Sequence, residues 1–303
     1  MNLLVTGTIG IDTIETPAGE HREGVLGGSC AYFAAAASHY GPVRLVAAVG
    51  EDFPDEHRGT LAKFPNIDAA GLEVRAGSKT FRWGGKYREN MDERETLFTE
   101  LGVLEEAPPP IPDAFADSDC VFLANSHPAV QMDFLDRLPG ASFVVADTMD
   151  LWIDTARDDL TRLLGRVTGL VLNYEEAEQY TGRRNPVTAG QKMLGQGPEF
   201  VVIKKGEHGA VLVHRDGLSA LPAYPTERVV DPTGAGDTFA GGMMAQIAKT
   251  GDTSIDGIRR AMAHGTIIAS FTIETFSLDR LAAITPAQIE ERYRTFAEML
   301  KLD

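Results

Sequence analysis

The stretch of the sequence best suited to chemistry is residues 231–242, DPTGAGDTFAGG, where glycines and two aspartates precede an apolar segment that predicts a helix. Glycines before a helix expose backbone N–H groups, and together with the helix dipole they favour a bound phosphate. Asp237 would repel that phosphate unless it acts as a base that takes a proton from a substrate hydroxyl. Amides that hold negative charge beside a base describe phosphoryl transfer to an alcohol. The simpler alternative is a helix N-cap in which Asp237 only serves the dipole.

The composition limits the class of protein. The chain has 303 residues, 43% of them hydrophobic, and we expect no membrane span because no run of about 18 apolar residues occurs. The net charge of −16 argues against nucleic acid or an anionic membrane as a partner. The N-terminus lacks a basic stretch before its apolar residues, so we expect no signal peptide and a cytoplasmic location. Cys30 and Cys120 lack metal-site spacing and are predicted to be two buried thiols.

Short apolar segments alternate with amphipathic or alanine-rich segments along most of the chain. This order predicts a doubly wound α/β fold with a mostly parallel sheet. Strands are expected at 3–7, 44–49, 121–124, 143–146, 169–172 and 200–203, and helices at 29–40, 128–138, 157–164 and 238–248. Ser29 is expected to cap the first of these helices.

Two segments interrupt that alternation. Residues 13–26 are polar and rich in turn formers, and residues 77–104 alternate in the way typical of hairpin strands. We expect both to form a small β lid inserted in a single domain that spans residues 1–303. An exposed lid face often needs cover, which predicts a homodimer through the lid.

The stretch DPTGAGDTFAGG closely resembles the C-terminal motif of the ribokinase-like, or PfkB, carbohydrate kinases. Further matches are the glycine pair before the alanine-rich helix, AAVGEDFPDEHRG at 47–59, LNYEEAE at 172–178 and KKGEHG at 204–209. The resemblance covers nearly the whole chain. It implies a three-layer α/β/α sandwich with a small β-sheet lid. It also implies transfer of the γ-phosphate of ATP, with Mg²⁺, to a hydroxymethyl group of a sugar or sugar-like substrate.

The resemblance assigns the chemistry to four residues. Asp237 would be the general base, and the amides of Gly234, Ala235 and Gly236 would hold the transferred phosphoryl group. A catalytically silent, sugar-binding regulator of the same fold is the alternative from another class, and the intact motif weighs against it. A nucleotide-linked dehydrogenase is less well supported, because TGTIG at 6–10 lacks the third glycine of a dinucleotide fingerprint.

On the substrate side, the resemblance implies that Asp12 binds substrate hydroxyls and that Gly27 and Gly28 let the backbone approach the substrate. Tyr32 stands where the family has an asparagine, so a polar sugar contact is replaced by an aromatic ring. Together with Trp83 on the expected lid, Tyr32 makes a nucleoside the rival of a plain sugar, because aromatic faces stack on bases and also pack on sugar C–H groups. Packing within the core or the lid is the alternative role for both.

On the nucleotide side, the resemblance implies the following roles. Asn173 and Glu176 would order Mg²⁺ and phosphate through water, which suits a hard cation that keeps several waters. Lys205 and Gly206 would lie along the nucleotide, Gly209 would close the turn, and His264 would line the adenine pocket. For Lys205 and His264, a surface charge and a structural helix residue are the alternatives.

A potassium site carries over only in part. Asp231 and Thr233 match its first half, but the tail FTIETFSLDRL at 271–281 lacks the arginine and glycine usual in the family. Activation by K⁺ is therefore left open.

Overall fold

Seven parallel strands and an antiparallel edge hairpin form the large sheet of the computed structural model, which describes residues 1–91 and 93–301. The strand order is β13-β12-β11-β10-β9-β8-β1-β4-β5, and only β12 and β13 run antiparallel to their neighbours. The strands are β1 (Leu3–Thr6), β4 (Val43–Gly50), β5 (Ile67–Arg75), β8 (Cys120–Leu123), β9 (Phe143–Asp147), β10 (Gly169–Asn173), β11 (Phe200–Lys204), β12 (Ala210–His214) and β13 (Gly217–Leu221).

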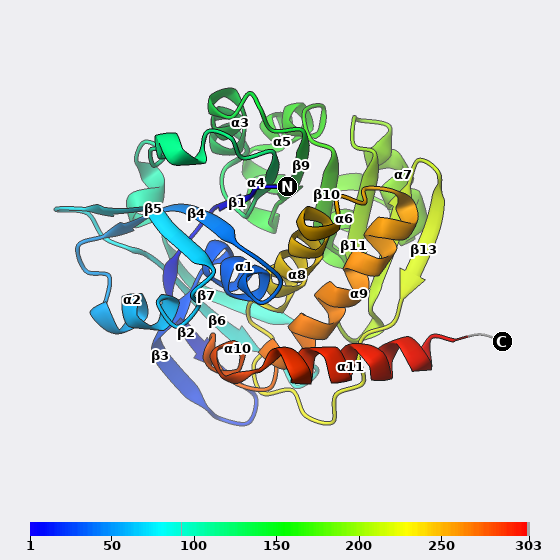
Figure 1. Ribbon diagram of the computed structural model, residues 1–303. Coiled ribbons are helices and arrows are strands. Elements are labelled where there is room, and N and C mark those ends of the chain that lie inside the picture. Colours follow the sequence, from blue (N-terminus) through cyan, green and yellow to red (C-terminus); the bar gives the residue numbers. More distant parts are fainter. Residues whose placement is uncertain (92, 302–303) are drawn as a thin grey trace.

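Helices cover both faces of this sheet (Figure 1), so the predicted three-layer α/β/α sandwich is confirmed. The central strands are buried on both faces and are almost entirely apolar for that reason. One face packs against α1 (Ser29–Ser38), α2 (Asp55–Leu61), α8 (Ala235–Thr250), α9 (Ile255–Thr272), α10 (Asp279–Ala283) and α11 (Pro286–Met299). The other packs against α3 (Pro128–Arg137), α4 (Asp150–Thr155), α5 (Arg157–Leu164), α6 (Tyr174–Thr181) and α7 (Pro186–Leu194).

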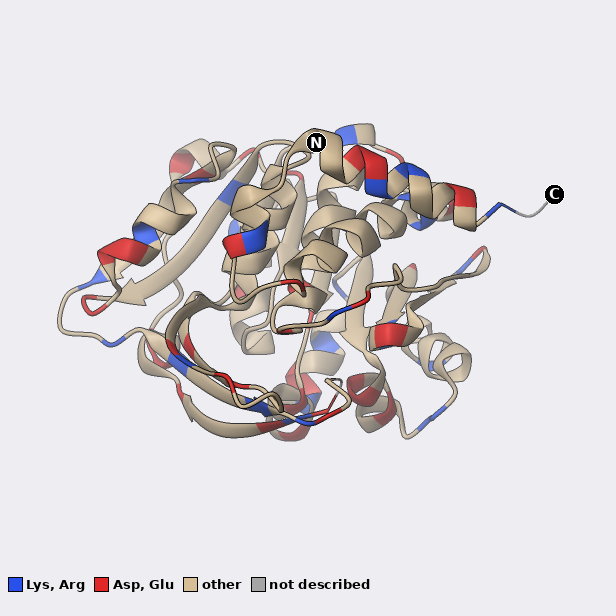
Figure 2. Ribbon diagram, turned by 90° about the horizontal axis from the view of Figure 1, so that it is seen from below, with Lys and Arg blue, Asp and Glu red and all other residues tan. Residues whose placement is uncertain are grey.

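The lid is a four-stranded sheet with the order β3-β2-β6-β7. Its strands are β2 (Gly10–Glu15), β3 (His21–Gly27), β6 (Phe81–Tyr87) and β7 (Arg94–Glu100), which come from the two segments that break the α/β alternation. The central pair, β2 and β6, runs parallel, whereas the outer pairs are antiparallel hairpins. Figure 2 shows this curved sheet below the large sheet, with acidic and basic residues interspersed along it.

Close packing of α8 fixes where its N-terminus lies. A Cβ on Gly241 would overlap the carbonyl oxygen of Phe33 in α1, and a Cβ on Gly242 would overlap Ile268 in α9. The glycine pair after the second aspartate of the motif is therefore a helix-packing device. The helix begins at Ala235 rather than at the expected 238, which places Asp237 in its first turn.

The expected cap of α1 is corrected by the structure. Gly28 is the N-cap residue, with a φ of 94° that favours glycine, and Ser29 is the first helical residue. The Oγ of Ser29 lies 3.0 Å from Oγ1 of Thr8 instead of capping the helix. Cys30 and Cys120 are buried and unbonded to each other, as predicted. In the described part of the chain, no helix has the length and apolar character that crossing a membrane requires.

Candidate active site

A cavity of about 1190 Å³ lies between the lid and the carboxyl ends of the parallel strands, where open α/β sheets bind their ligands. The last residues of β9, β10 and β11, which are Asp147, Asn173 and Lys204, all reach it. The predicted site residues that line it are Asp12, Gly28, Tyr32, Trp83, Asn173, Glu176, Lys205, Gly206, Gly209, Gly234, Ala235, Gly236 and Asp237. Within the described residues, Gly27, Asp231 and His264 lie outside its lining.

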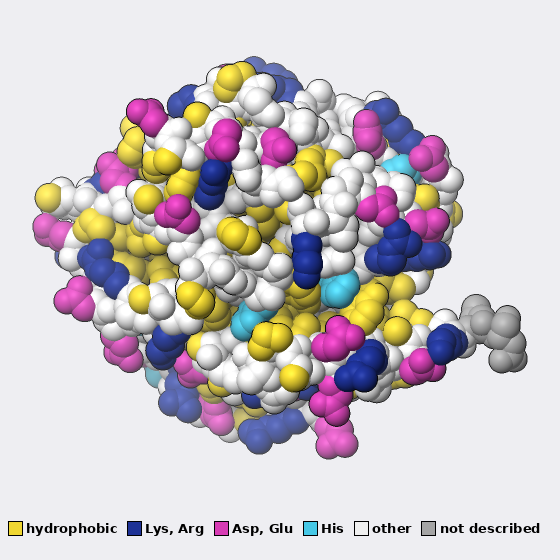
Figure 3. Space-filling model, viewed as in Figure 1, with side chains coloured by type: hydrophobic (Ala, Val, Ile, Leu, Met, Phe, Trp, Pro, Cys, Tyr) yellow, Lys and Arg dark blue, Asp and Glu magenta, His cyan; other side chains and the backbone are white. Residues whose placement is uncertain are grey.

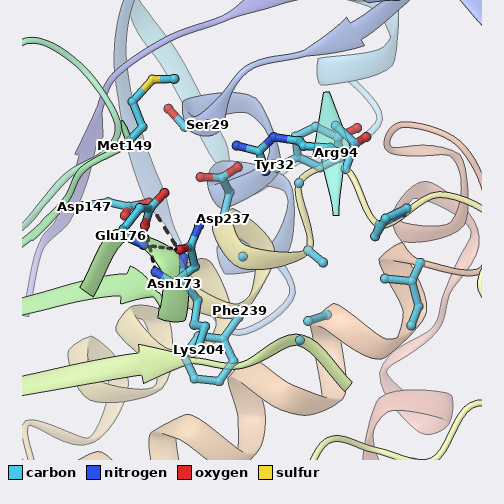
Figure 4. A pocket seen from close by; sticks show the side chains of 18 of the residues that line it. Ser29, Tyr32, Arg94, Asp147, Met149, Asn173, Glu176, Lys204, Asp237 and Phe239 are labelled. Atoms are coloured by element: carbon cyan, nitrogen blue, oxygen red, sulfur yellow. Dashed lines mark hydrogen bonds and ion pairs between the residues drawn. The ribbon is translucent and has the colours of Figure 1, made fainter. Parts of the chain in front are cut away.

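Asp237 stands in the first turn of α8 at the wall of the cavity. Burial, together with the charge of Asp147, raises its pKa to about 7, while Lys204 and Arg94 act in the opposite direction. A carboxylate with a pKa near neutrality is suited to accept a proton from a hydroxyl group. Figure 4 shows its side chain pointing into the space between Tyr32 and Asn173.

The turn before α8 carries the predicted anion hole. Gly234 has a φ of 75° and caps the helix, and the N–H groups of a first turn have no partner within the helix. The N–H of Ala235 donates to the carbonyl of Pro232 at 3.1 Å, so this amide is already occupied in the turn. The amides of Gly234 and Gly236 are therefore the better candidates for holding a phosphoryl group.

Two carboxylates and one ammonium, those of Asp147, Glu176 and Lys204, gather near Asp237. Nζ of Lys204 lies 4.0 Å from Oδ2 of Asp147, and both side chains are largely buried. Burial and the neighbouring Asp147 raise the pKa of Glu176 to about 8. Figure 4 shows Asp147, Glu176 and Asn173 grouped together, with Lys204 extending toward them.

Asn173 and Glu176 form the capping box of α6. The amide of Glu176 donates to Oδ1 of Asn173 at 2.8 Å, and the amide of Asn173 donates to Oε2 of Glu176 at 2.7 Å. This arrangement stabilises the helix start and also fixes both side chains at the cavity wall. The three-residue spacing of Asn173 and Glu176 is therefore explained by the capping box, and it also fits the role predicted for both residues in ordering Mg²⁺.

The donor set fits Mg²⁺ held mainly by water and phosphate. The carboxylates of Asp147, Glu176 and Asp237 outnumber the ammonium of Lys204, and after burial the charge of Asp147 is the next cause that raises the pKa of Glu176 and of Asp237. Among the described residues, no group of three His, Cys, Asp or Glu side chains forms a metal cage. A hard cation that keeps several waters and bridges substrate phosphates suits such a wall.

Asp12 reaches the cavity from β2 of the lid and is 3% exposed. Burial raises its pKa to about 8, with smaller contributions from Asp231 and Asp237, and its Oδ1 has no hydrogen-bond partner among the described residues. A Cβ on Gly27 would overlap the Asp12 carboxylate, so Gly27 makes room for this side chain. A buried acceptor without a donor costs free energy until a ligand hydroxyl supplies one.

Tyr32 does not present an open aromatic face, although it lines the cavity. The residue is 1% exposed, and a Cβ on Gly234 would overlap its ring, so the ring packs on the turn before α8. Its hydroxyl has no partner within the described residues. The geometry therefore favours the packing alternative for the Tyr32 ring, which lies against the predicted anion hole and leaves the hydroxyl available to a substrate.

Trp83 supplies the aromatic surface of the lid instead. A Cβ on Gly85 would overlap the six-membered ring of the Trp83 indole, so the indole lies flat over this glycine. The guanidinium of Arg94 in β7 lies 5.7 Å from the Trp83 ring and also lines the cavity. Arg82, the other lid arginine near Trp83, is paired with Asp52 at 3.0 Å.

The turn after β11 lines the part of the cavity predicted to hold the nucleotide. The ammonium of Lys205 forms no ion pair with the described residues, and its Nζ lies 5.9 Å from the Tyr174 ring. Its backbone N–H donates to the Gly209 carbonyl at 2.7 Å. Gly206 and Gly209 both have positive φ, of 53° and 81°. The turn therefore needs both glycines, whatever else they contact.

His264 is corrected by the structure. Its ring stacks on Tyr293 with 4.2 Å between centroids, and burial lowers its pKa to about 4. Helix α9 meets the cavity one turn further on, through Thr266, Ala269 and Ser270.

Asp231 lies behind the motif and is 1% exposed. Its Oδ1 accepts the N–H of Thr233 at 2.9 Å, and its Oδ2 has no partner among the described residues. Thr233 also joins the motif to the lid, because its Oγ1 lies 2.9 Å from the hydroxyl of Tyr87.

Comparison with known proteins agrees with this geometry. The model of the pfkB family of carbohydrate kinases matches residues 4–279. The chain belongs to this family. It is accordingly a phosphotransferase whose acceptor is an alcohol, and its fold is the ribokinase fold.

Relatives and solved structures of several kinds resemble the chain. A cytidine kinase of Thermococcus kodakarensis is 34% identical over 251 residues, which are 81% of this chain and 88% of the relative. A Burkholderia thailandensis nucleoside kinase in complex with inosine has a TM-score of 0.78 and 19% identity, over 97% of this chain and 98% of that one. A putative ribokinase II from E. coli in complex with ATP and Mg²⁺ has a TM-score of 0.77 and 18% identity, over 97% and 99%.

Sequence reasoning missed three charged residues of the site. Asp147 and Lys204 directly follow the strands predicted at 143–146 and 200–203, and Arg94 lies in the expected lid. Lys204 even opens the KKGEHG match, but none of the three was given a role. The signal available for Asp147 and Lys204 was their place at the carboxyl ends of the parallel strands β9 and β11, which flank β10.

Proposed function

We propose that the chain is a nucleoside kinase that transfers the γ-phosphate of ATP to the 5′-hydroxymethyl group of a nucleoside. A nucleoside is the alternative acceptor that the sequence analysis set beside a sugar or sugar-like substrate, and similarity to a cytidine kinase supports it. The observation that carries it is the Trp83 indole, which lies flat over Gly85 and faces the cavity in register with Asp12. A base could stack on the indole while the ribose hydroxyls donate to the orphaned Asp12 carboxylate.

The residues act on the reaction in distinct ways. Asp12 orients the ribose. Asp237 takes the proton of the acceptor hydroxyl while the oxygen of that hydroxyl forms a bond to the γ-phosphorus. The bond from that phosphorus to the bridging oxygen of ADP breaks at the same time. The amides at the start of α8 stabilise the charge on the transferred group. Mg²⁺, when bound, neutralises phosphate charge, and Glu176 and Asn173 would orient its waters.

The lid gives this chemistry a dry environment. The hydrogen bond between Tyr87 and Thr233 joins the lid to the loop that precedes Asp237. Exclusion of water strengthens the electrostatic contacts and limits hydrolysis of ATP.

A plain sugar is the second candidate acceptor, because Asp12 and Gly28 suit sugar hydroxyls without any base. A silent sugar-binding regulator is disfavoured by a base of suitable pKa beside a helix N-terminus. A cytoplasmic location, a homodimer through the lid and activation by K⁺ at Asp231 remain predictions. The free edge of β7 and the exposed Leu97 and Phe98 support the dimer, and the unpartnered Oδ2 of Asp231 supports the cation.

The experiment that tests the function measures ADP release from Mg-ATP with cytidine, inosine, adenosine, ribose, fructose and myo-inositol as acceptors. Assays in KCl and in choline chloride test the potassium prediction together with it. The proposal expects at least one nucleoside to be turned over more efficiently than every free sugar. A free sugar that outperforms all nucleosides overturns it, and silence with all acceptors while ATP binds supports the regulator.

A further inference from the structure

We propose that Lys204 is the side chain that binds the γ-phosphoryl group during transfer. The proposal deepens the proposed function only in its phosphoryl-transfer part, and it does not depend on which acceptor is used.

The path of the Lys204 side chain brings its ammonium to the start of α8. A Cβ on Gly236 would lie 2.8 Å from Nζ and 3.5 Å from Cε of Lys204. Because Gly236 lacks this atom, the ammonium approaches the backbone of the first helical turn, where the N–H groups point to an incoming anion. Gly236, the second glycine of GAG, therefore leaves room for the Lys204 ammonium and also offers its own N–H group.

The ammonium keeps donors for a ligand. It is 4.0 Å from Oδ2 of Asp147, which is too far for a direct hydrogen bond, and an ammonium carries three N–H groups. A lysine that served only as the counter-ion of Asp147 would be expected to contact it directly. The observed position lies between Asp147 and the anion hole.

The surrounding charges keep Lys204 protonated. Burial works against its charged form, but Asp147 of β9, Glu176 of α6 and Asp237 of α8 outweigh burial and raise the pKa of the ammonium, while Arg94 of β7 opposes them. The positive charge of Lys204 beside Asp237 also offsets the repulsion between the Asp237 carboxylate and a phosphate. The repulsion that the motif alone suggested is thereby reduced.

The neighbouring lysine provides a matched comparison. Lys205 is one residue further on, and its Nζ lies 5.9 Å from the Tyr174 ring on the nucleotide side of the cavity. If Lys205 binds the nucleotide, it does so without distinguishing a diphosphate from a triphosphate. Of these two lysines, Lys204 is the one beside the start of α8.

The test compares Lys204→Met and Lys205→Met by calorimetric titration with Mg-ADP and Mg-AMP-PNP, without any acceptor. We expect Lys204→Met to remove most of the preference for AMP-PNP over ADP, because the charge-assisted hydrogen bond from the ammonium to the third phosphate is lost. Lys205→Met should change both affinities by the same factor. Asp147→Asn should keep the preference for AMP-PNP, because it leaves the ammonium in place.

Two outcomes would overturn the proposal. One is a preference for AMP-PNP that survives in Lys204→Met, and the other is the same loss of preference in Asp147→Asn as in Lys204→Met, which would make the pair structural. Should Lys204→Met fail to fold, Gly236→Ala displaces the ammonium without removing its charge and must weaken AMP-PNP more than ADP. Because no acceptor is present, a wrong nucleoside assignment does not affect these results.

Discussion

Asp12 of β2 and Trp83 of β6 are register partners in the lid sheet, so their side chains emerge next to each other, and both line the cavity. One offers an unpartnered buried carboxylate and the other an aromatic ring held flat over Gly85. The two side chains match the two halves of a nucleoside, a ribose with hydroxyl donors and a planar base.

Removing the Trp83 indole should weaken the binding of nucleosides more than the binding of ribose. We expect Trp83→Ala to raise KM for the preferred nucleoside by about tenfold or more, since stacking of a base on an aromatic ring contributes about 1–3 kcal/mol. Gly85→Ala should act in the same direction, because the new Cβ displaces the indole. Steady-state kinetics with nucleoside and with ribose measures the effect. Phe98→Ala is the control: this ring is 37% exposed, lies over Gly84 and is outside the cavity lining. An equal loss in Phe98→Ala would refute a specific role for Trp83.

Replacing Asp237, the proposed general base, should greatly lower the rate of phosphoryl transfer and leave the affinity for Mg-ATP nearly unchanged. We expect Asp237→Asn to lower kcat by about 10²-fold or more while the calorimetric affinity for Mg-ATP stays nearly unchanged, which is the usual result of losing a general base. The thermal unfolding midpoint, recorded alongside, checks that the variant folds. Turnover within a few-fold of the parent would show that Asp237 is not the base.

The acidic limb of the pH profile should report Asp237. Its pKa of about 7 means that the carboxylate form is lost as the pH falls through neutrality, so kcat should be highest above pH 8 and decline below pH 7. Measuring kcat from pH 5.5 to 9 at saturating substrates tests this. A profile flat down to pH 5.5 contradicts the raised pKa in the loaded enzyme.

We expect Asp12 to stabilise the complex with the substrate and to lower the free energy of unfolding of the protein without substrate. The pKa of Asp12 is raised from 3.8 to about 8, so between these pH values the folded protein keeps a proton on Asp12 that the unfolded chain has lost. The free energy of unfolding therefore falls as the pH rises from about 4 to 8. We expect Asp12→Asn to raise the unfolding midpoint by a few degrees at pH 8 and by less at pH 5, and to weaken the acceptor by more than tenfold. Calorimetric unfolding at the two pH values measures the first effect. An equal gain at both would mean that the carboxylate charge is not its cause.

The local features of the fold could be predicted from the sequence. Apolar runs such as that of β11 and the alanine-rich α1 specify their own structure, and the glycines of the motif mark the start of α8 to within three residues. Long-range relationships could not be predicted in the same way. Nothing near Tyr32 in the chain reveals that its ring covers Gly234, about 200 residues away, and so the sequence left its role open between stacking and packing.

The same limitation explains the charged residues that were missed. Lys204 and Lys205 are equivalent in a sequence, and only the alternation of side chains along β11 directs one into the charge cluster and the other toward Tyr174. His264 was placed in the cavity although α9 turns a different face toward it, because the rotation of a helix depends on what packs against it.

The most direct test of the central claim is a competition assay. The protein is given Mg-ATP with equimolar cytidine, inosine, ribose and fructose, and the products are identified by mass spectrometry and ³¹P NMR. We predict that a nucleoside 5′-monophosphate forms first and predominates. Predominant formation of a sugar phosphate from ribose or fructose would contradict the assignment of the cavity to a nucleoside.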